Sequence, residues 1–146
     1  MGDIETIERS MITLRRSQRR RTLARLSGAL PNATFEVIDV IEAAELAGQP
    51  VTVSAVADAL SIDEPRASKL VAAAVEAGLV ERRADQADGR RSLLARTAAG
   101  MAVTEQIHGF RRRVIGSALS SWDKGDVSDF ARLLNRFITD FASVTR

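Results

Sequence analysis

The sequence predicts a mainly α-helical (α+β) fold: a winged helix-turn-helix with long N- and C-terminal dimerisation helices. Three observations predict it. Two short helical segments with a tight turn between them lie between residues 51 and 77. Two short strands with an arginine-rich turn follow, up to residue 97. Both ends of the chain carry long segments in which apolar residues recur at helical spacing.

Composition sets limits on the kind of protein this is. The chain has 146 residues, 45% of them hydrophobic, which suits one globular domain with a real core. It has no cysteine and a single histidine, so we expect no disulfide, no metal site and no cofactor. No apolar run approaches the roughly 20 residues of a membrane span. No secretion signal is evident, so we expect a cytoplasmic protein.

The first helix is predicted from about Asp3 to Ala29. Four apolar residues near its start follow a 3-4-3 spacing, namely Ile4, Ile7, Met11 and Leu14. This apolar stripe is thin, which is typical of a helix that packs against another subunit. A basic cluster follows, made of Arg15, Arg16, Arg19, Arg20, Arg21 and Arg25. A solvated or subunit-facing surface and direct contact with DNA phosphates both remain open for this cluster.

The second helix is predicted to end near Ala47, before Gly48 and Pro50. Three of its apolar residues share a face that we expect to be buried, namely Phe35, Ile38 and Ile41. The β-branched segment 51–53 then forms either a short strand or the approach to the next helix. Thr52 or Ser54 can cap that helix, because both carry a hydroxyl at its start.

Asp63 has the features of an N-cap for the second helix of the helix-turn-helix, predicted over residues 64–77. Glu64 and Pro65 occupy its first turn, where an acid suits the helix dipole and proline loses no hydrogen bond. Gly78 suits a left-handed end of the helix. We expect the core side of this helix to carry Leu70, Val71, Ala74 and Val75.

The hairpin that follows is strongly basic. Residues 82–96 contain five arginines against two aspartates, an excess of three positive charges. The turn is expected at residues 84–89, between strands that begin at Leu79 and return through Leu94. A basic β-ribbon of this size can reach the DNA backbone or the minor groove.

The remainder of the chain is predicted to form two helices. Thr97 caps the first of them, and Asp123 with Asp126 forms a plausible capping box for the last. Trp122 precedes the last helix as a staple or packing anchor. The last helix carries a rich apolar stripe from Val127 to Val144. Such stripes at the ends of the chain favour an obligate dimer.

Over nearly its whole length the sequence resembles the multiple antibiotic resistance regulator (MarR) family of bacterial transcription factors. The resemblance rests on the runs TVSAVADAL, RASKLV, EAGLVERR, DQADGRR and LLARTAAG between residues 52 and 100. It implies a single domain over 1–146, with dimerisation helices in 1–30 and 98–146 and a DNA-binding lobe in 31–97. It also implies a homodimeric, ligand-responsive repressor that binds double-stranded DNA at a palindromic operator.

The resemblance assigns the major groove to the recognition helix 64–77. The residues that would face the groove are Pro65, Arg66, Ser68 and Lys69. Arg66 could make a bidentate contact with guanine, and Ser68 or Lys69 could reach phosphate or a base edge. The alternative is that Arg66 and Lys69 are solvated surface charges. Residues 72–74 are all alanine, whereas many relatives place charges there, so the resemblance supports contacts by the first two turns only.

The resemblance also assigns the minor groove to the wing, residues 82–96. Arg90 matches the arginine that enters the groove, and Asp88 matches the acid that orients it; Asp88 could otherwise be a simple turn residue. Backbone contacts or intramolecular ion pairs are expected of three further arginines, namely Arg82, Arg83 and Arg91. Ser54 is either a phosphate donor or a helix cap.

A small aromatic or lipophilic effector is implied by the family as a further partner. The candidates for its pocket, chosen by location alone, are Met11, Phe35, Ile38, His108 and Arg112. His108 could equally be an ordinary, partly exposed helix residue. A winged-helix module that binds other proteins and not DNA is the alternative function. An enzyme is not expected, because the sequence has no nucleophile–base constellation, paired-carboxylate motif, phosphate loop or metal spacing.

Overall fold

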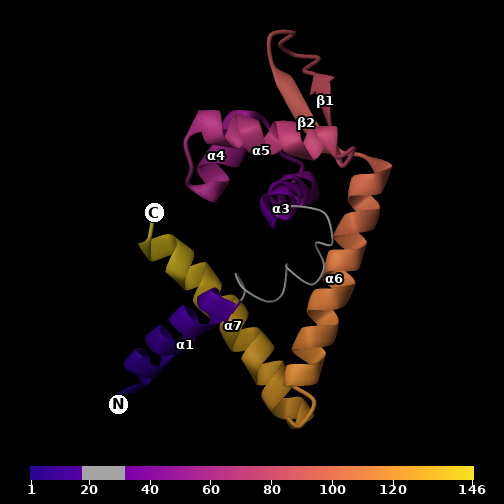
Figure 1. The fold of residues 1–146 in the computed structure, drawn as a ribbon. Coiled ribbons are helices and arrows are strands. Elements are labelled where there is room, and N and C mark those ends of the chain that lie inside the picture. Colours follow the sequence, from indigo (N-terminus) through magenta and orange to yellow (C-terminus); the bar gives the residue numbers. More distant parts are fainter. Residues whose placement is uncertain (18–31) are drawn as a thin grey trace. The chain divides into compact units, whose positions relative to one another are not determined.

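The computed structural model describes residues 1–17 and 32–146, which form six helices and two strands (Figure 1). Their bounds are α1 Asp3–Ser17, α3 Asn32–Leu46, α4 Val53–Leu60, α5 Glu64–Glu76, β1 Val80–Ala84, β2 Ser92–Arg96, α6 Ala98–Ala118 and α7 Lys124–Val144. They fall into two compact units, Met1–His108 and Gly109–Arg146. The predicted continuation of the first helix to Ala29, with four of its arginines, lies outside the described residues.

The core of the first unit lies where α3, α4 and α5 meet the hairpin. The predicted apolar face of α3 is buried, with Phe35 2% exposed and Ile38 and Ile41 fully covered. From α5, Ala67, Val71 and Ala74 enter the same core. The helical spacing of the apolar residues therefore identified the buried faces of α3 and α5 correctly.

Side-chain caps define both helices of the helix-turn-helix. Thr52 caps α4, because its hydroxyl oxygen accepts a hydrogen bond from the N–H of Ala55 (3.1 Å). Of the segment 51–53, the first two residues are the approach to this helix and Val53 is its first residue, so the segment is not a strand. Asp63 caps α5 as predicted, its Oδ1 accepting from the N–H of Arg66 (2.7 Å). The turn between them includes Ser61 in the left-handed region (φ 55°).

The hairpin pairs β1 with β2 in antiparallel register, so that Val80 lies opposite Arg96. Gly78 adopts a positive φ of 77°, as predicted for the end of α5, and lets the chain turn into β1. Thr97 joins both ends of the hairpin. Its hydroxyl donates to the carbonyl oxygen of Gly78 (2.7 Å) and accepts from the N–H of Gly100 (3.0 Å). The base of the wing is thus tied to the starts of β1 and α6.

The second unit contains the end of α6 and the whole of α7. Trp122 packs edge-on against Phe130, with ring centroids 5.5 Å apart. Asp123 is the N-cap of α7, but its side chain makes no capping hydrogen bond. The predicted capping box with Asp126 is therefore wrong. The spacing of two acids identified where the helix begins, but an aspartate at the fourth position has a shorter side chain than the glutamate of a true capping box.

Most of the apolar stripe of α7 is uncovered within one chain. Six of its large apolar residues are between 43% and 78% exposed, namely Phe130, Leu133, Leu134, Ile138, Phe141 and Val144. No residue of α7 is buried. Contiguous exposed apolar surface of this kind is unusual on a monomeric protein and marks an interaction surface. Among the described helices, none is long and apolar enough to cross a membrane.

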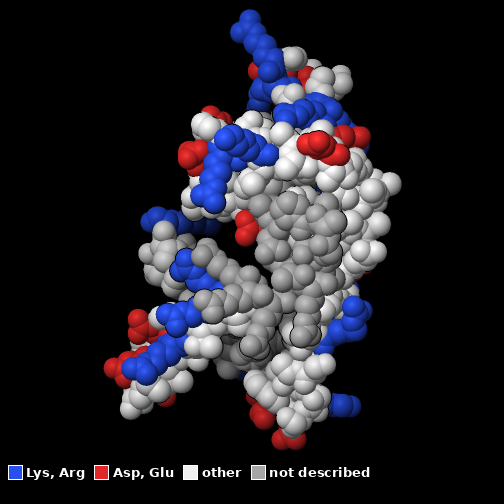
Figure 2. Space-filling view, in the orientation of Figure 1, with Lys and Arg blue, Asp and Glu red and all other residues white. Residues whose placement is uncertain are grey.

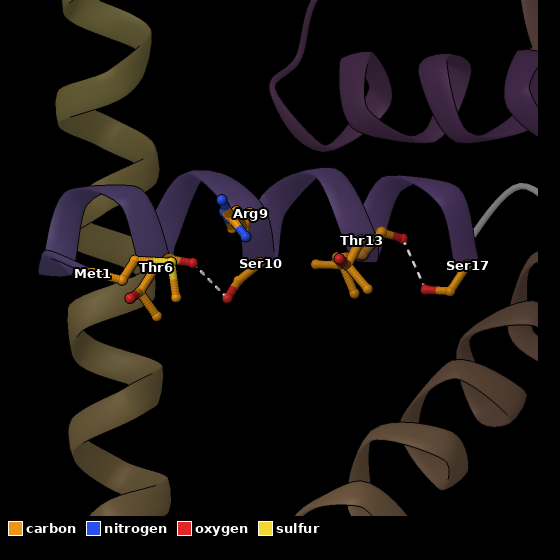
Figure 3. A pocket seen from close by; sticks show the side chains of 7 residues that line it. Met1, Thr6, Arg9, Ser10, Thr13 and Ser17 are labelled. Carbon is orange, nitrogen blue, oxygen red and sulfur yellow. Dashed lines mark hydrogen bonds between the residues drawn. The ribbon is translucent and has the colours of Figure 1, made fainter.

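Helix α1 has two different faces. One carries hydroxyl side chains around a shallow depression of about 420 Å³, with Thr6, Ser10, Thr13 and Ser17 on the same side (Figure 3). The hydroxyls of Ser10 and Ser17 donate to carbonyl oxygens of the helix itself, at 2.7 and 3.0 Å. The predicted apolar stripe runs along the adjoining side of the helix, where Leu14 also lines the depression, and none of α1 is buried.

Candidate nucleic-acid interface

The face of α5 that points away from the core carries the predicted groove-facing residues. Because Ala67, Val71 and Ala74 are buried, the opposite side of the helix is left open to solvent. The exposed residues there include Pro65, Arg66, Ser68 and Lys69. Asp63 holds the first turn of the helix through the N–H of Arg66, so the backbone beneath the Arg66 side chain is fixed.

Small side chains continue this face beyond Lys69. Ala72 and Ala73 are exposed, and Ala74 is buried. The two alanines leave the middle of this face without a long side chain, and the exposed Glu76 follows at its end. The surface of α5 can therefore be approached closely along its middle turns, and its long basic side chains lie in the first two turns.

Four arginines of the wing are exposed, namely Arg82, Arg83, Arg90 and Arg91. Two of them have acidic neighbours in the hairpin: the Nε of Arg83 donates to Glu81 (2.8 Å), and the Nε of Arg91 lies 4.0 Å from Asp85. Within the described part of the chain, no ion pair engages Arg82 or Arg90. The intramolecular pairing predicted for this group is thus present for Arg83 and Arg91, and Arg90 is available to an external anion.

Asp88 shapes the tip of the wing through the backbone. Its Oδ1 accepts from the N–H of Arg90 (3.0 Å), and its carbonyl oxygen accepts from the N–H of Arg91 (3.0 Å). This is an Asx-type turn, in which a short acid stands in for a backbone acceptor. The carboxylate therefore sets the course of the chain at Arg90, which agrees with the turn role that the sequence analysis left open for Asp88.

Basic side chains gather over the hairpin and over the neighbouring α4–α5 region of the same unit (Figure 2). Four exposed cations of these elements are in no ion pair with another described residue, namely Arg66, Lys69, Arg82 and Arg90. Ser54, exposed in the first turn of α4, adds a hydroxyl. Since Thr52 makes the cap, the Ser54 side chain is not needed for capping. Unpaired cations on an exposed helix face and a protruding hairpin suit a polyanion.

The fifth arginine of the hairpin behaves differently, and sequence reasoning missed it. Arg96 turns into the protein, where its NH1 lies 3.2 Å from Glu42 and its NH2 lies 2.7 Å from Glu45. Glu42 also contacts His108, with Nε2 2.7 Å from Oε1. The partners lie 51 to 66 residues apart along the chain, so no local spacing could have revealed them.

The five candidates for an effector pocket lie in different surroundings. Phe35 and Ile38 are buried core residues, and Met11 is 40% exposed on α1. His108 is engaged by Glu42 within the first unit, whereas Arg112 is an exposed residue of the second.

An exposed recognition helix beside an arginine-bearing hairpin defines a winged helix-turn-helix protein. Comparison with known proteins finds one family match: residues 30–91 are similar to the model of the MarR family. This match covers the helix-turn-helix and most of the wing, and it confirms the resemblance drawn from the sequence. The MarR family consists of transcription regulators, not enzymes. None of the curated proteins matches the sequence.

The whole described fold is that of solved MarR family structures. A MarR family protein from Bacillus stearothermophilus has a TM-score of 0.78 and 17% identity, over 96% of this chain and 94% of that one. Wild-type MarR from E. coli has a TM-score of 0.67 and 22% identity, over 87% and 93%. S. aureus MepR, solved in complex with DNA, has a TM-score of 0.64 and 16% identity, over 94% and 98%.

Proposed function

We propose that this protein is a homodimeric, sequence-specific transcription regulator that binds double-stranded DNA at a palindromic operator. One observation carries the proposal: the first unit presents an open, basic face of α5 together with a wing in which the Arg90 guanidinium forms no ion pair with any other described residue. The fold is shared with MarR family regulators, one of which, MepR, has been solved with DNA.

Each element has a distinct part in this proposal. Helix α5 enters the major groove, where Arg66 reads a guanine edge and Lys69 and Ser68 contact phosphate or base edges. The wing reaches the adjacent minor groove through Arg90, while Arg82 and Arg91 contact the backbone. The N-terminal residues of a recognition helix are the ones that contact base edges in helix-turn-helix proteins, which fits the position of Arg66.

Dimerisation supplies the second half of the site. The uncovered stripe of α7 and the uncovered apolar face of α1 are the surfaces that a second copy would bury. Burial of a large apolar side chain is favourable by roughly 1.5–3 kcal/mol, so a stripe of several such residues can drive association. Two copies related by a two-fold axis would place two α5 helices about one helical turn apart on the DNA.

The proposal also includes a direction of regulation and a small-molecule effector. We propose that the protein represses transcription and releases DNA on binding a small aromatic or lipophilic molecule, as the family resemblance implies. A regulator of bacterial genes works where the chromosome lies, so we place it in the bacterial cytoplasm. The alternative is a winged-helix module that binds other proteins through the same surface.

Salt-dependent DNA binding tests the proposal. The affinity for a random-sequence duplex should fall by about 10³-fold or more between about 50 and 200 mM salt, because several phosphate contacts per subunit release counterions. Fluorescence anisotropy with a labelled duplex measures this. No binding at the lower salt concentration, with the protein folded, would refute DNA binding and favour the protein-interaction module.

A further inference from the structure

The cluster around Arg96 joins three elements of the first unit. Arg96 is the last residue of β2, Glu42 and Glu45 lie on α3, and His108 lies on α6. The Nε of Arg96 donates to Glu45 Oε2 (2.9 Å) and its NH1 donates to Glu42 Oε2 (3.2 Å). The backbone N–H of Arg96 donates to Glu45 Oε1 (3.2 Å). Both the side chain and the backbone of this residue are therefore held by α3.

The cluster is more enclosed than the other ion pairs of the hairpin. The side chains of Arg96 and Glu42 are 13% and 16% exposed, whereas those of Arg83 and Glu81 are 64% and 44% exposed. Partly buried ion pairs add little net stability, because desolvation offsets their attraction, but breaking one leaves an uncompensated charge. The planar guanidinium also fixes the geometry of its partners more tightly than a flexible ammonium would.

Helix α3 contacts both of the elements that are proposed to face DNA, namely α5 and the wing. Its residues Ile38 and Ile41 share one core with Val71 of α5. The same helix holds the end of β2 through Glu42 and Glu45. A second attachment lies close by, where the N–H of Leu94 donates to the carbonyl oxygen of Val51 (2.8 Å). The direction in which the wing leaves the protein, relative to α5, is therefore set at the base of β2.

We propose that Arg96 is a positioning residue for DNA binding: its ion pairs with Glu42 and Glu45 hold the wing at the angle that brings Arg90 to the minor groove while α5 occupies the major groove. The proposal rests on the DNA-binding function proposed above. Arg96 itself does not touch DNA. His108 supports the arrangement, because its Nε2 lies 2.7 and 3.0 Å from the two oxygens of Glu42 and fixes that carboxylate.

A double-mutant cycle between Arg96 and Arg90 tests this role. The probe is a duplex selected from random-sequence DNA by the wild-type protein. Arg96→Gln should weaken binding to it by about tenfold when Arg90 is present, and by less than about twofold in an Arg90→Ala background. The reason is that the angle of the wing affects DNA affinity through Arg90, so it no longer matters once Arg90 is replaced. A purely structural role would give the same loss in both backgrounds.

The conservative variant adds a second readout. Arg96→Lys keeps the charge but loses the forked geometry, so it should restore part of the affinity that Arg96→Gln loses. Arg132→Gln is the matched control, because it removes an exposed ion pair with Asp129 within α7. We expect that control to bind DNA as the wild-type protein does.

The outcomes separate this proposal from the proposed function. If the wild-type protein selects and binds no duplex, DNA binding itself fails. If it binds, and folded Arg96→Gln binds equally well or loses the same factor with and without Arg90, the positioning role is refuted. Should Arg96→Gln not fold, Glu45→Gln replaces it in the same cycle. An unchanged affinity, or an equal loss in both backgrounds, for Glu45→Gln would then refute the proposal.

Discussion

Gly100, in the first turn of α6, lies directly against the backbone of Leu79 at the start of the wing. A β-carbon at position 100 would overlap with the carbonyl oxygen of Leu79 and lie 3.1 Å from its carbonyl carbon. The same carbonyl oxygen accepts a hydrogen bond from the N–H of Thr97 (3.1 Å). The close approach of α6 to the strand therefore requires glycine for space, and not for an unusual backbone angle.

Gly100→Ala should therefore destabilise the protein, by about 1–3 kcal/mol, because backbone must move to admit the methyl group. Thermal or denaturant unfolding measures the change. Gly116→Ala is the matched control in the same helix, since nothing lies within 4 Å of a β-carbon there. The control should be neutral or stabilising by about 0.5–1 kcal/mol, as alanine favours helix. Equal behaviour of the two variants would contradict this account of the contact.

Arg66→Ala should cost about 1–3 kcal/mol of binding free energy per subunit on the preferred operator and relax its specificity at one position of each half-site. The reason is that Arg66 reads a base edge in the proposed complex. Titration against the operator and against a scrambled duplex at fixed salt measures both effects. An equal loss on the two duplexes would show that Arg66 contacts phosphate only.

Arg90→Ala should weaken binding to every duplex and reduce the salt dependence, with any remaining preference confined to A·T content of the minor groove. Arg91→Ala should have a smaller effect, because Arg91 already lies near Asp85. The same titrations, repeated at several salt concentrations, compare the two variants. Unchanged affinity of Arg90→Ala for both duplexes would mean that the hairpin is not a DNA-contacting wing.

Asp88 offers a test of how the tip is shaped. Asp88→Ala should produce a milder form of the Arg90→Ala loss, since it removes the acceptor of the Arg90 N–H. Asp88→Asn keeps an acceptor oxygen and removes a negative charge near the phosphates, so it should bind DNA at least as well as the wild-type protein. If the asparagine variant were as weak as the alanine variant, the carboxylate would act through its charge, by orienting the Arg90 guanidinium.

Phe137→Asp and Phe141→Asp should give monomer or aggregate, because each places a charge in the α7 stripe that a second copy is proposed to bury. Sedimentation velocity at micromolar concentration measures the change in oligomeric state. Thr139→Asp, which puts the same charge on the polar side of α7, should leave the dimer intact. A monomeric wild-type protein in this experiment would refute the proposed dimer.

Local patterns in the sequence predicted most of the fold. The buried faces of α3 and α5, the caps Asp63 and Thr97, and the turn at Gly78 all follow from spacing and turn chemistry within a few residues. The capping box at Asp123 failed because such patterns state where a helix begins, but not which hydrogen bonds form there. The Arg96 cluster could not be predicted at all, since its partners meet only after α3, β2 and α6 have packed together.

The central claim is that two copies of this chain read one DNA site through α5 and the wing. Selection of bound sequences from a random-sequence duplex library by the wild-type protein tests it most directly. The account predicts an inverted repeat whose half-sites are about one helical turn apart, centre to centre. An asymmetric selected site, or no enrichment of any sequence, would contradict it.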